Sequence, residues 1–203
     1  MDGTLIDSDA AHFWAFNQML APFDVVIDHE RFERVVVGGN NETIMRELLP
    51  QIDAQRRAQL AQQKEALVLH NLHRIRLVAG AAVLVRSAAA AGRRIAVVTN
   101  APRANAMAVL AHFELAEHVD TVVAAEDVQP PKPAPDPYRE ALRRCAVSAA
   151  EAVAFEDSVN GVTAAARADI TVYGVTGSRS GAPLLQAGAT ACVATLEEVR
   201  VDA

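Results

Sequence analysis

Adjacent carboxylates follow an apolar run near the end of the chain. Glu156 and Asp157 come directly after residues 153–155 and before a helical segment, so their side chains would start close together. Such a pair repels unless a cation lies beside it, and hard carboxylate oxygens, phosphate and water form the octahedral shell of Mg²⁺. The pair therefore indicates a magnesium site. The alternative is a helix cap, in which Asp157 or Ser158 accepts from backbone amides.

Two further segments carry groups that suit an anionic ligand. Thr99 and Asn100 follow the apolar run 94–98, where a hydroxyl and the next backbone amide would face a phosphate oxygen. The same dipeptide is also common in turns and helix caps. Lys132 lies between two prolines, and this restricted backbone suits a charge that must pair with a phosphate and an aspartyl group. A solvated loop lysine is the alternative interpretation.

A fourth polar segment opens the chain, which begins Met1-Asp2-Gly3-Thr4-Leu5-Ile6-Asp7-Ser8. With the other three segments it resembles the haloacid dehalogenase (HAD) superfamily, and specifically its branch of β-phosphoglucomutase-like and sugar-phosphate phosphatases with a helical cap after the first motif. The resemblance covers nearly the whole chain. It rests on four segments in this order: Asp2-Gly3-Thr4, Thr99-Asn100, Lys132 and Glu156-Asp157.

The first motif of that family reads Asp-x-Asp-Gly-Thr-Leu-x-Asp-Ser, with the nucleophile first and the general acid/base second. Met1 occupies the x position, so the resemblance implies that the nucleophile lies just upstream of Met1. We expect the natural protein to begin several residues earlier with an apolar strand that ends in this Asp. We expect the chain as given to be inactive and poorly stable. Asp7 is a weak substitute, because with Ser8 it more simply caps the next helix.

The resemblance implies a role for each matched residue. Asp2 would protonate the leaving-group oxygen and later deprotonate the attacking water, and its main-chain carbonyl would bind the metal. Thr99 and Asn100 would hold the transferring phosphoryl group, and Lys132 would offset its charge. The Glu156-Asp157 pair would hold Mg²⁺ together with Asp2.

Further candidates lie in the segment that the resemblance identifies as the cap. His12 matches a histidine of the mutase-like members and could couple cap closure to acid/base work, although a single histidine on an amphipathic helix is more often structural. Substrate choice in such enzymes resides in the cap, here near Gly39, Asn40 and Arg46. The Gly38-Gly39 pair could equally be a plain turn between cap helices.

Hydrophobic periodicity predicts the elements that must position these residues. Residues 10–77 show apolar spacings near three and four, which indicate helices. Beyond them, short apolar runs alternate with helical segments, which favours a parallel sheet covered on both faces, with ligands at the carboxyl ends of the strands. The predicted strands lie at 94–98, 119–123, 153–155, 171–175 and 191–193, and the predicted helices at 103–112, 136–145, 158–167 and 182–187.

The predicted fold is α/β: a doubly wound parallel-sheet, Rossmann-like core with an inserted helical cap. The core comprises residues 1–9 and 78–203, and the cap comprises residues 10–77. The resemblance adds that the first core strand is missing from the chain. Asp169 stands at a helix-to-strand junction, where a left-handed backbone is often needed and Asp tolerates it.

Composition excludes several classes of protein. The chain has 203 residues, of which 51% are hydrophobic and 22% charged, enough for one globular domain with a sizeable core or with a small insertion. An excess of acidic residues, 25 against 19 basic ones, gives no basic surface for nucleic acid or an anionic membrane. No apolar run approaches the ~20 residues of a membrane span, and the two cysteines are expected to be buried thiols. We expect a cytoplasmic protein, as a monomer or weak homodimer.

The leading hypothesis is a Mg²⁺-dependent phosphatase that hydrolyses a small phosphorylated metabolite, expected to be a sugar phosphate, through an aspartyl-phosphate. The covalent step divides one difficult displacement into two, while metal and lysine spread the phosphoryl charge. One alternative is a β-phosphoglucomutase-like isomerase. Another is a catalytically dead phosphate-ester binder, if Met1 is the true start. A metal-free dehalogenase is disfavoured by Asp2-Gly3-Thr4 and Glu156-Asp157.

Overall fold

The computed structural model describes residues 1–201, and their contacts divide the chain into two compact units. The core unit comprises residues 1–7 and 77–203, and the cap unit comprises residues 8–76. The boundary falls at Ser8 rather than at Ala10, because the first helix already begins at Asp9. Residues 202 and 203, which belong to the predicted core range, lie outside the described residues.

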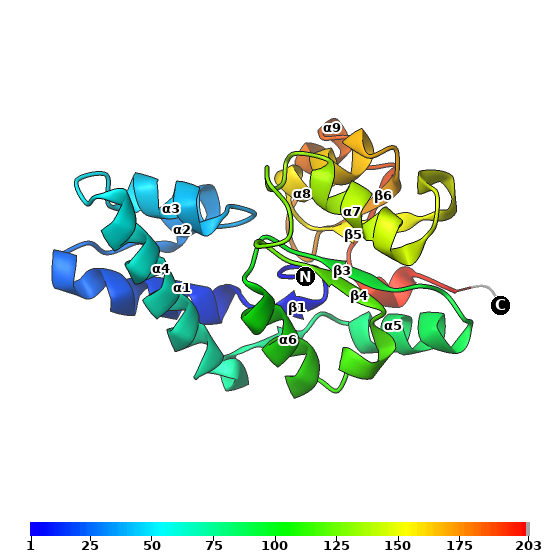
Figure 1. The fold of residues 1–203 in the computed structure, drawn as a ribbon, viewed down its shortest axis with the longest axis horizontal. Coiled ribbons are helices and arrows are strands. Elements are labelled where there is room, and N and C mark those ends of the chain that lie inside the picture. Colours follow the sequence, from blue (N-terminus) through cyan, green and yellow to red (C-terminus); the bar gives the residue numbers. More distant parts are fainter. Residues whose placement is uncertain (202–203) are drawn as a thin grey trace. The chain divides into compact units, whose positions relative to one another are not determined.

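The cap unit is helical (Figure 1). It contains α1 (Asp9–Leu20), η1 (Ala21–Phe23), α2 (His29–Val35), α3 (Asn41–Leu48), α4 (Ala54–Leu69) and η2 (Leu72–Arg74). Three of these helices begin where a side-chain oxygen accepts a backbone N–H of the first turn, from Asp28, Asn40 and Asp53. Ser8 precedes α1 without a side-chain capping bond, and Asp7 belongs to strand β1. The prediction that these two residues cap α1 is therefore wrong.

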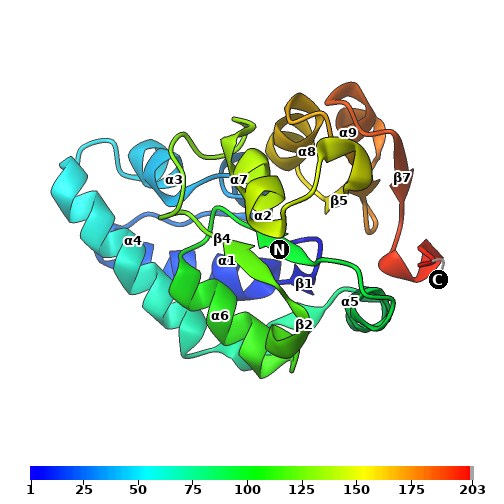
Figure 2. The ribbon, with the colours of Figure 1, turned by 45° about the vertical axis from the view of Figure 1, so that its right-hand side comes forward.

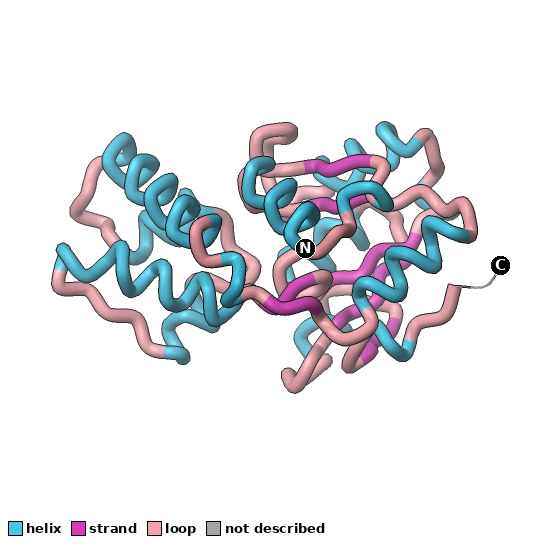
Figure 3. Tube along the Cα trace, turned by 90° about the horizontal axis from the view of Figure 1, so that it is seen from below, coloured by secondary structure: helices cyan, strands magenta, loops and turns pink. Residues whose placement is uncertain are grey.

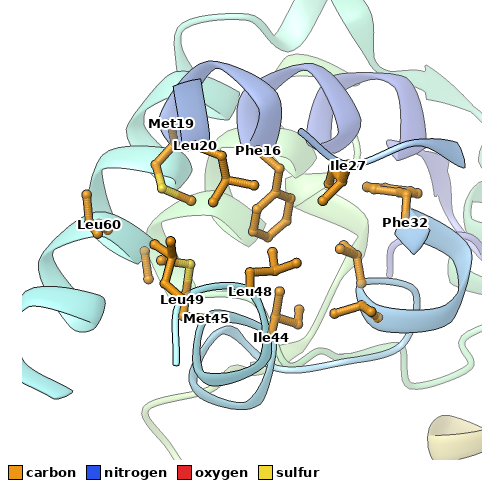
Figure 4. Close-up of a cluster of buried hydrophobic side chains, with 13 residues drawn as sticks. Phe16, Met19, Leu20, Ile27, Phe32, Ile44, Met45, Leu48, Leu49 and Leu60 are labelled. Atoms are coloured by element: carbon orange, nitrogen blue, oxygen red, sulfur yellow. The ribbon is translucent and has the colours of Figure 1, made fainter. Parts of the chain in front are cut away.

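Apolar side chains at helical spacing form the core of the cap unit. Figure 4 shows the apolar face of α1 turned toward that of α3, with side chains from the α1–α2 connection and from α2 and α4 around them. This arrangement explains the spacings of three and four in the sequence, since such residues lie on one helix face. The labelled side chains are Phe16, Met19, Leu20, Ile27, Phe32, Ile44, Met45, Leu48, Leu49 and Leu60.

The core unit has strands that alternate with helices. Its strands are β1 (Ile6–Asp7), β2 (Arg76–Leu77, at the unit boundary), β3 (Ala96–Val98), β4 (Thr121–Val123), β5 (Val153–Glu156), β6 (Thr171–Val175) and β7 (Ala191–Val193). Its helices are α5 (Ala81–Ala90), α6 (Arg103–His112), α7 (Asp136–Cys145), α8 (Val159–Arg167) and α9 (Ala182–Gln186), with short 3-10 turns η3 (Ala116–His118), η4 (Ala149–Glu151) and η5 (Leu196–Glu198).

The strand pairs β3–β4, β5–β6 and β6–β7 of the core unit are parallel, as predicted. β3 pairs with β4, with Val97 opposite Val122, and β6 lies between β5 and β7. Figure 2 shows α7 and α8 beside these strands. Side chains of both sheets share one apolar cluster with α7 and α8, which includes Val98, Val123 and Val172. Both sheets therefore belong to one packed core.

The sheet is interrupted between β3 and β5. β3 is paired only with β4, and β5 only with β6, so among residues 1–201 no strand is hydrogen-bonded into the interval between them. Figure 3 shows the strands in magenta within the core unit. In Figures 1 and 2 the N-terminus lies close to the β3–β4 pair and to β5. The carboxyl ends of β3 and β5 are the positions at which the sequence placed Thr99 and Glu156.

Cys145 and Cys192 are both free thiols, and both are half-buried rather than fully buried. None of the helices within residues 1–201 combines the length and the apolar character needed to cross a membrane.

Candidate active site

The opening segment Asp2-Gly3-Thr4 contacts the Glu156-Asp157 pair at Asp157. The hydroxyl of Thr4 donates to Asp157 Oδ1 at 3.0 Å. Gly3 has a φ of +70°, and a Cβ at this position would lie 2.0 Å from Asp157 Oδ2. The opening turn can therefore approach the carboxylate only because this residue is glycine. The turn itself is held by the carbonyl of Met1, which accepts the N–H of Leu5 at 2.7 Å, and it fixes Asp2 directly before Gly3.

The end of β3, directly before Thr99, and the end of β5 meet at Lys132. Its ammonium donates to the main-chain oxygen of Val98 at 3.0 Å, at the end of β3, and it forms an ion pair with Glu156 at the end of β5. Lys132 is only 6% exposed and Glu156 only 3% exposed. This burial excludes the alternative that Lys132 is a solvated loop lysine. Lys132 connects the two strand ends on either side of the interruption in the sheet.

Tyr138 completes this arrangement and was not among the predicted site residues. Its O–H donates to Glu156 Oε1 at 2.5 Å, the same oxygen that pairs with Lys132. On the other side of the carboxylate, a Cβ at Gly161 would lie 2.0 Å from Glu156 Oε2. Glu156 is therefore fixed by two donors and by a helix backbone that approaches it closely.

Thr99 lies at the carboxyl end of β3. Its N–H donates to Val123 O at 2.9 Å, and its hydroxyl oxygen accepts the N–H of Ala101 at 3.0 Å. This bond forms a local turn, the alternative interpretation of the dipeptide. A hydroxyl that accepts one hydrogen bond can still donate another. Thr99 is buried and Asn100 is half-buried.

Ser158 supplies the helix cap after the carboxylate pair. Its hydroxyl accepts the N–H of Gly161 at 3.1 Å, in an extended backbone conformation typical of an N-cap. Asp157 accepts from Thr4 instead. The cap and the acidic pair are therefore separate features, and the cap does not account for Glu156 or Asp157.

The pKa values of the two adjacent carboxyl groups are shifted in opposite directions by their neighbours. For Asp157, burial and the neighbouring charge of Glu156 raise the pKa to about 6. For Glu156, burial also acts to raise the pKa, but Lys132, the N-terminal ammonium and the hydrogen bond from Tyr138 outweigh it, and the pKa is lowered from 4.5. Tyr138 stays a donor, because burial and the charge of Glu156 raise its pKa well above 10.0. Glu156 is thus charged near neutral pH, whereas for Asp157 the N-terminal ammonium and the hydrogen bond from Thr4 do not outweigh burial and the charge of Glu156.

This charge distribution fits a divalent cation beside Asp157. A buried carboxylate with a raised pKa is stabilised in its charged form by a nearby positive charge, and carboxylate and carbonyl oxygens are ligands for Mg²⁺. Within residues 1–201, however, no three His, Cys, Asp or Glu side chains gather in a way that could hold a metal ion. The remaining ligands must therefore include a main-chain carbonyl, water, substrate or another residue.

The other predicted residues lie in the cap unit. His12 is on α1 and Arg46 is an exposed residue of α3. Asn40 is the N-cap of α3, where its side-chain oxygen accepts the N–H of Thr43 at 3.1 Å. Gly39 follows the turn of residues 36–38, so the alternative of a turn between cap helices describes this backbone. The structure assigns Asn40 a structural contact in addition to any role in binding.

Replacing Tyr138 tests the hydrogen bond to Glu156. Tyr138→Phe is expected to lower the free energy of unfolding by about 1.5–3 kcal/mol, because a buried charged acceptor loses a donor. Urea denaturation followed by circular dichroism measures the change. Tyr173→Phe is the matched control: the ring of Tyr173 stacks on Phe155, and its variant should stay within ~0.5 kcal/mol of the original chain. Equal effects of the two substitutions would contradict the assignment.

Comparisons with known proteins identify the family of this chain. The family described as haloacid dehalogenase-like hydrolase matches residues 1–175. The phosphoglycolate phosphatase of Cupriavidus necator is 32% identical over 97% of this chain and 87% of its own length. The fructose-1-phosphate phosphatase YqaB of Escherichia coli is 31% identical over 86% of this chain and 93% of its own. CbbY from Rhodobacter sphaeroides, solved in complex with phosphate, has a TM-score of 0.86 at 28% identity and covers 98% of this chain and 92% of its own. The chain described here belongs to the haloacid dehalogenase-like hydrolase family.

Proposed function

We propose that this protein is a phosphatase that hydrolyses small phosphorylated metabolites, with sugar phosphates as the expected class. The observation that supports this most strongly is the convergence of Thr4, Lys132, Glu156 and Asp157 at the carboxyl ends of β3 and β5. The relatives add support, because they are named as phosphoglycolate and fructose-1-phosphate phosphatases. A mutant of CbbY was solved with xylulose-(1,5)bisphosphate, which is also a small phosphorylated carbohydrate.

The proposed metal is Mg²⁺, held by Asp157, by the main-chain carbonyl of Asp2 and by Glu156. Glu156 Oε1 already accepts from Lys132 and Tyr138, so Oε2 is the oxygen that would serve the metal. When bound, Mg²⁺ supplies positive charge that stabilises the transferring phosphoryl group. Asp157 is the principal ligand in this proposal, since burial and the charge of Glu156 raise its pKa and a divalent cation would stabilise its charged form.

The side chains of the core unit then perform the reaction. A carboxylate nucleophile, proposed at the position before Met1, attacks phosphorus, and Asp2 gives its proton to the leaving oxygen. Asp2 next accepts a proton from the water that hydrolyses the aspartyl-phosphate. Thr99 and Asn100 hold the phosphoryl oxygens, and Lys132 offsets their charge.

Substrate selection is proposed for the cap unit. His12, Gly39, Asn40 and Arg46 are the candidate residues, with Arg46 as the cation best suited to a second anionic group of a substrate. The capping bond of Asn40 to Thr43 uses its side-chain oxygen, so its amide group is the part that could donate to a ligand.

Phosphate release from a panel of sugar phosphates and from phosphoglycolate, with and without Mg²⁺, tests the proposal. The protein for this assay carries an aspartate before Met1. Mg²⁺-dependent release from at least one ester is expected. Conversion of glucose 1-phosphate to glucose 6-phosphate without phosphate release would favour a mutase instead. Saturable binding without any turnover would favour a catalytically dead binder.

Metal affinity should depend on the proton of Asp157. The raised pKa means that the charged form is disfavoured in the folded state, so Asp157 destabilises the fold as the pH rises from 3.8 through about 6 unless a cation binds. A metal must displace this proton. Binding of Mn²⁺, an EPR-visible substitute for Mg²⁺, should therefore strengthen about tenfold per pH unit up to about pH 6 and then level off. Asp157→Asn should abolish this dependence, and equal affinities of the original chain at about pH 5 and about pH 7.5 would contradict the prediction.

A further inference from the structure

A buried ion pair lies inside the cap unit, on helix α4. Lys64 Nζ donates to Glu65 Oε1 at 2.6 Å, and these residues are only 2% and 7% exposed. Both are buried residues of α4, which also presents Leu60 and Ala61 to the apolar cluster of the cap. Charged side chains are rarely buried in this way unless they are paired. The contacts around the pair must therefore offset the cost of burying its charges.

Two further side chains from other helices complete the cluster. Asn41, the first residue of α3, donates to Glu65 Oε1 at 2.8 Å. Lys64 Nζ lies 3.3 Å from Nδ1 of His12 on α1, and 4.7 Å from the centre of the Phe16 ring. The ammonium of Lys64 thus lies between the carboxylate of Glu65, an imidazole nitrogen and an aromatic face, and Asn41 holds the carboxylate in place.

The charge state of Glu65 follows from these contacts. Burial acts to raise its pKa, but the charge of Lys64, the charge that His12 carries only in its protonated form, and the hydrogen bonds from Lys64 and Asn41 outweigh burial, and the pKa is lowered from 4.5. Glu65 is therefore a carboxylate near neutral pH. A buried amine beside a carboxylate keeps its proton, whereas a buried amine without a counter-charge tends to be neutral.

The protonation state of Lys64 determines which ring nitrogen of His12 can accept a hydrogen bond. An ammonium has three donors and no acceptor, so the nitrogen of His12 that faces it must be the acceptor. In a neutral imidazole, one nitrogen accepts and the other carries the proton. A neutral amine at the same place could also accept, and the ring could then carry its proton on Nδ1.

We propose that Glu65 is a positioning residue, whose charge keeps Lys64 an ammonium and thereby fixes the proton of neutral His12 on Nε2. The ring then acts at Nε2 only as a donor, which suits an oxygen ligand such as a hydroxyl or phosphate oxygen of a sugar phosphate. The choice of ligand class rests on the proposed function. The fixed tautomer does not, because it follows from contacts within the cap unit alone.

Nitrogen-15 NMR of the full chain tests the tautomer directly. Long-range couplings from the ring carbon-bound protons distinguish the protonated ring nitrogen from the bare one, and the spectrum is recorded at about pH 8, where imidazole is ordinarily neutral. In the original chain, His12 should show its proton on Nε2. A proton on Nδ1, or a mixture of both forms, would overturn the proposal without any variant.

Matched variants test the part played by Glu65. Glu65→Gln keeps the size and an acceptor oxygen but removes the charge, and it should shift His12 toward the Nδ1-protonated form. Glu47→Gln, at an exposed position of α3, is the control and should leave the spectrum of His12 unchanged. If Glu65→Gln leaves the His12 signals in place, the proposal is wrong.

A second variant covers the case in which Glu65→Gln fails to fold. The double variant Lys64→Met with Glu65→Leu removes both charges and fits the apolar surroundings, so it should fold and should release His12 into a mixture of tautomers. A His12 that still carries its proton only on Nε2 in this folded variant would overturn the proposal. Failure of the phosphatase assay with the expected tautomer present would count against the proposed function and leave this inference intact.

Discussion

A chain with an aspartate immediately before Met1, preceded by about four apolar residues in a strand pattern, is expected to hydrolyse phosphate esters roughly 10⁴- to 10⁶-fold faster than the chain that begins at Met1. The reason is chemical, since the proposed covalent step needs a carboxylate nucleophile. The N-terminal ammonium lies close enough to influence the pKa values of Glu156 and Asp157. An aspartate added there would therefore be placed beside the ion pair of Lys132.

The same extension should stabilise the protein. The interval between β3 and β5 contains no paired strand within the described residues, and a parallel strand there would gain hydrogen bonds on both sides. Burial of about four apolar side chains at ~1.5–3 kcal/mol each would contribute roughly 6–12 kcal/mol as an upper range. Urea denaturation measures the gain, and steady-state phosphate release measures the activity.

An extension that ends in asparagine instead of aspartate is the control for this experiment. It should show the same gain in the free energy of unfolding and almost none of the gain in turnover. Equal turnover with aspartate and asparagine would show that the added side chain is not the nucleophile. An unchanged free energy of unfolding in both extended chains would show that no strand enters the interval between β3 and β5.

Replacement of Lys132 by methionine should be the most damaging single substitution in the core unit. It leaves the buried carboxylate of Glu156 without its cation and removes the contact to Val98 O. Loss of one partner of a buried ion pair costs about 3–5 kcal/mol. In the extended chain, loss of a cation at the transferring phosphoryl group should also lower kcat by about 10²–10³-fold.

The double variant Lys132→Met with Glu156→Gln separates these two effects. It removes both charges, so most of the free energy of unfolding should return, while kcat should stay low because the cation is still absent. Recovery of both quantities would mean that Lys132 serves only to neutralise Glu156. A Lys132→Met variant with full stability and full turnover would contradict the assigned role altogether.

Much of the core unit follows from local patterns. The helices predicted at 103–112 and 136–145 and the strands predicted at 171–175 and 191–193 have the observed bounds. Asp169 has a φ of +62°, as expected for a helix-to-strand junction. The helix at 136–145 and the strand at 171–175 are predictable because their apolar residues Tyr138, Ala141 and Val172 are buried in one shared cluster.

Other elements depended on contacts that the sequence does not show. The sequence predicts strands at 94–98 and 119–123. The observed strands begin two residues later than predicted, at Ala96 and Thr121. The N–H of Ile95 donates to the side chain of Asp120 at 2.8 Å, so it is unavailable to a strand partner. Helix α5 was not among the predicted helices: it is rich in alanine and only Ala81 is buried, so its pattern carries little amphipathic signal.

The candidate site was predictable as a set of motifs but not as a network. The order of the four segments identified Lys132 and Asp157, because strand ends of a parallel sheet meet at one edge. The bond from Tyr138 to Glu156 joins residues that are far apart in the sequence, and only the run Lys-Pro-Ala-Pro-Asp-Pro-Tyr at residues 132–138 hinted at it. The ion pair of Lys64 and Glu65 has a clearer signal in the sequence. Lys64 lies four residues after the buried Leu60, so a charged residue occupies a position of the apolar helix face.

Detection of a phosphorylated aspartate tests the central claim most directly. The extended chain with Asp2→Asn should form the aspartyl-phosphate but hydrolyse it slowly, because the residue that activates water is missing. Acid quenching during reaction with a substrate ester and Mg²⁺, followed by peptide mass spectrometry, should place one phosphoryl group on the aspartate before Met1. Full turnover in the extended chain together with no phosphorylated peptide, or with the phosphoryl group on another residue, would contradict the account.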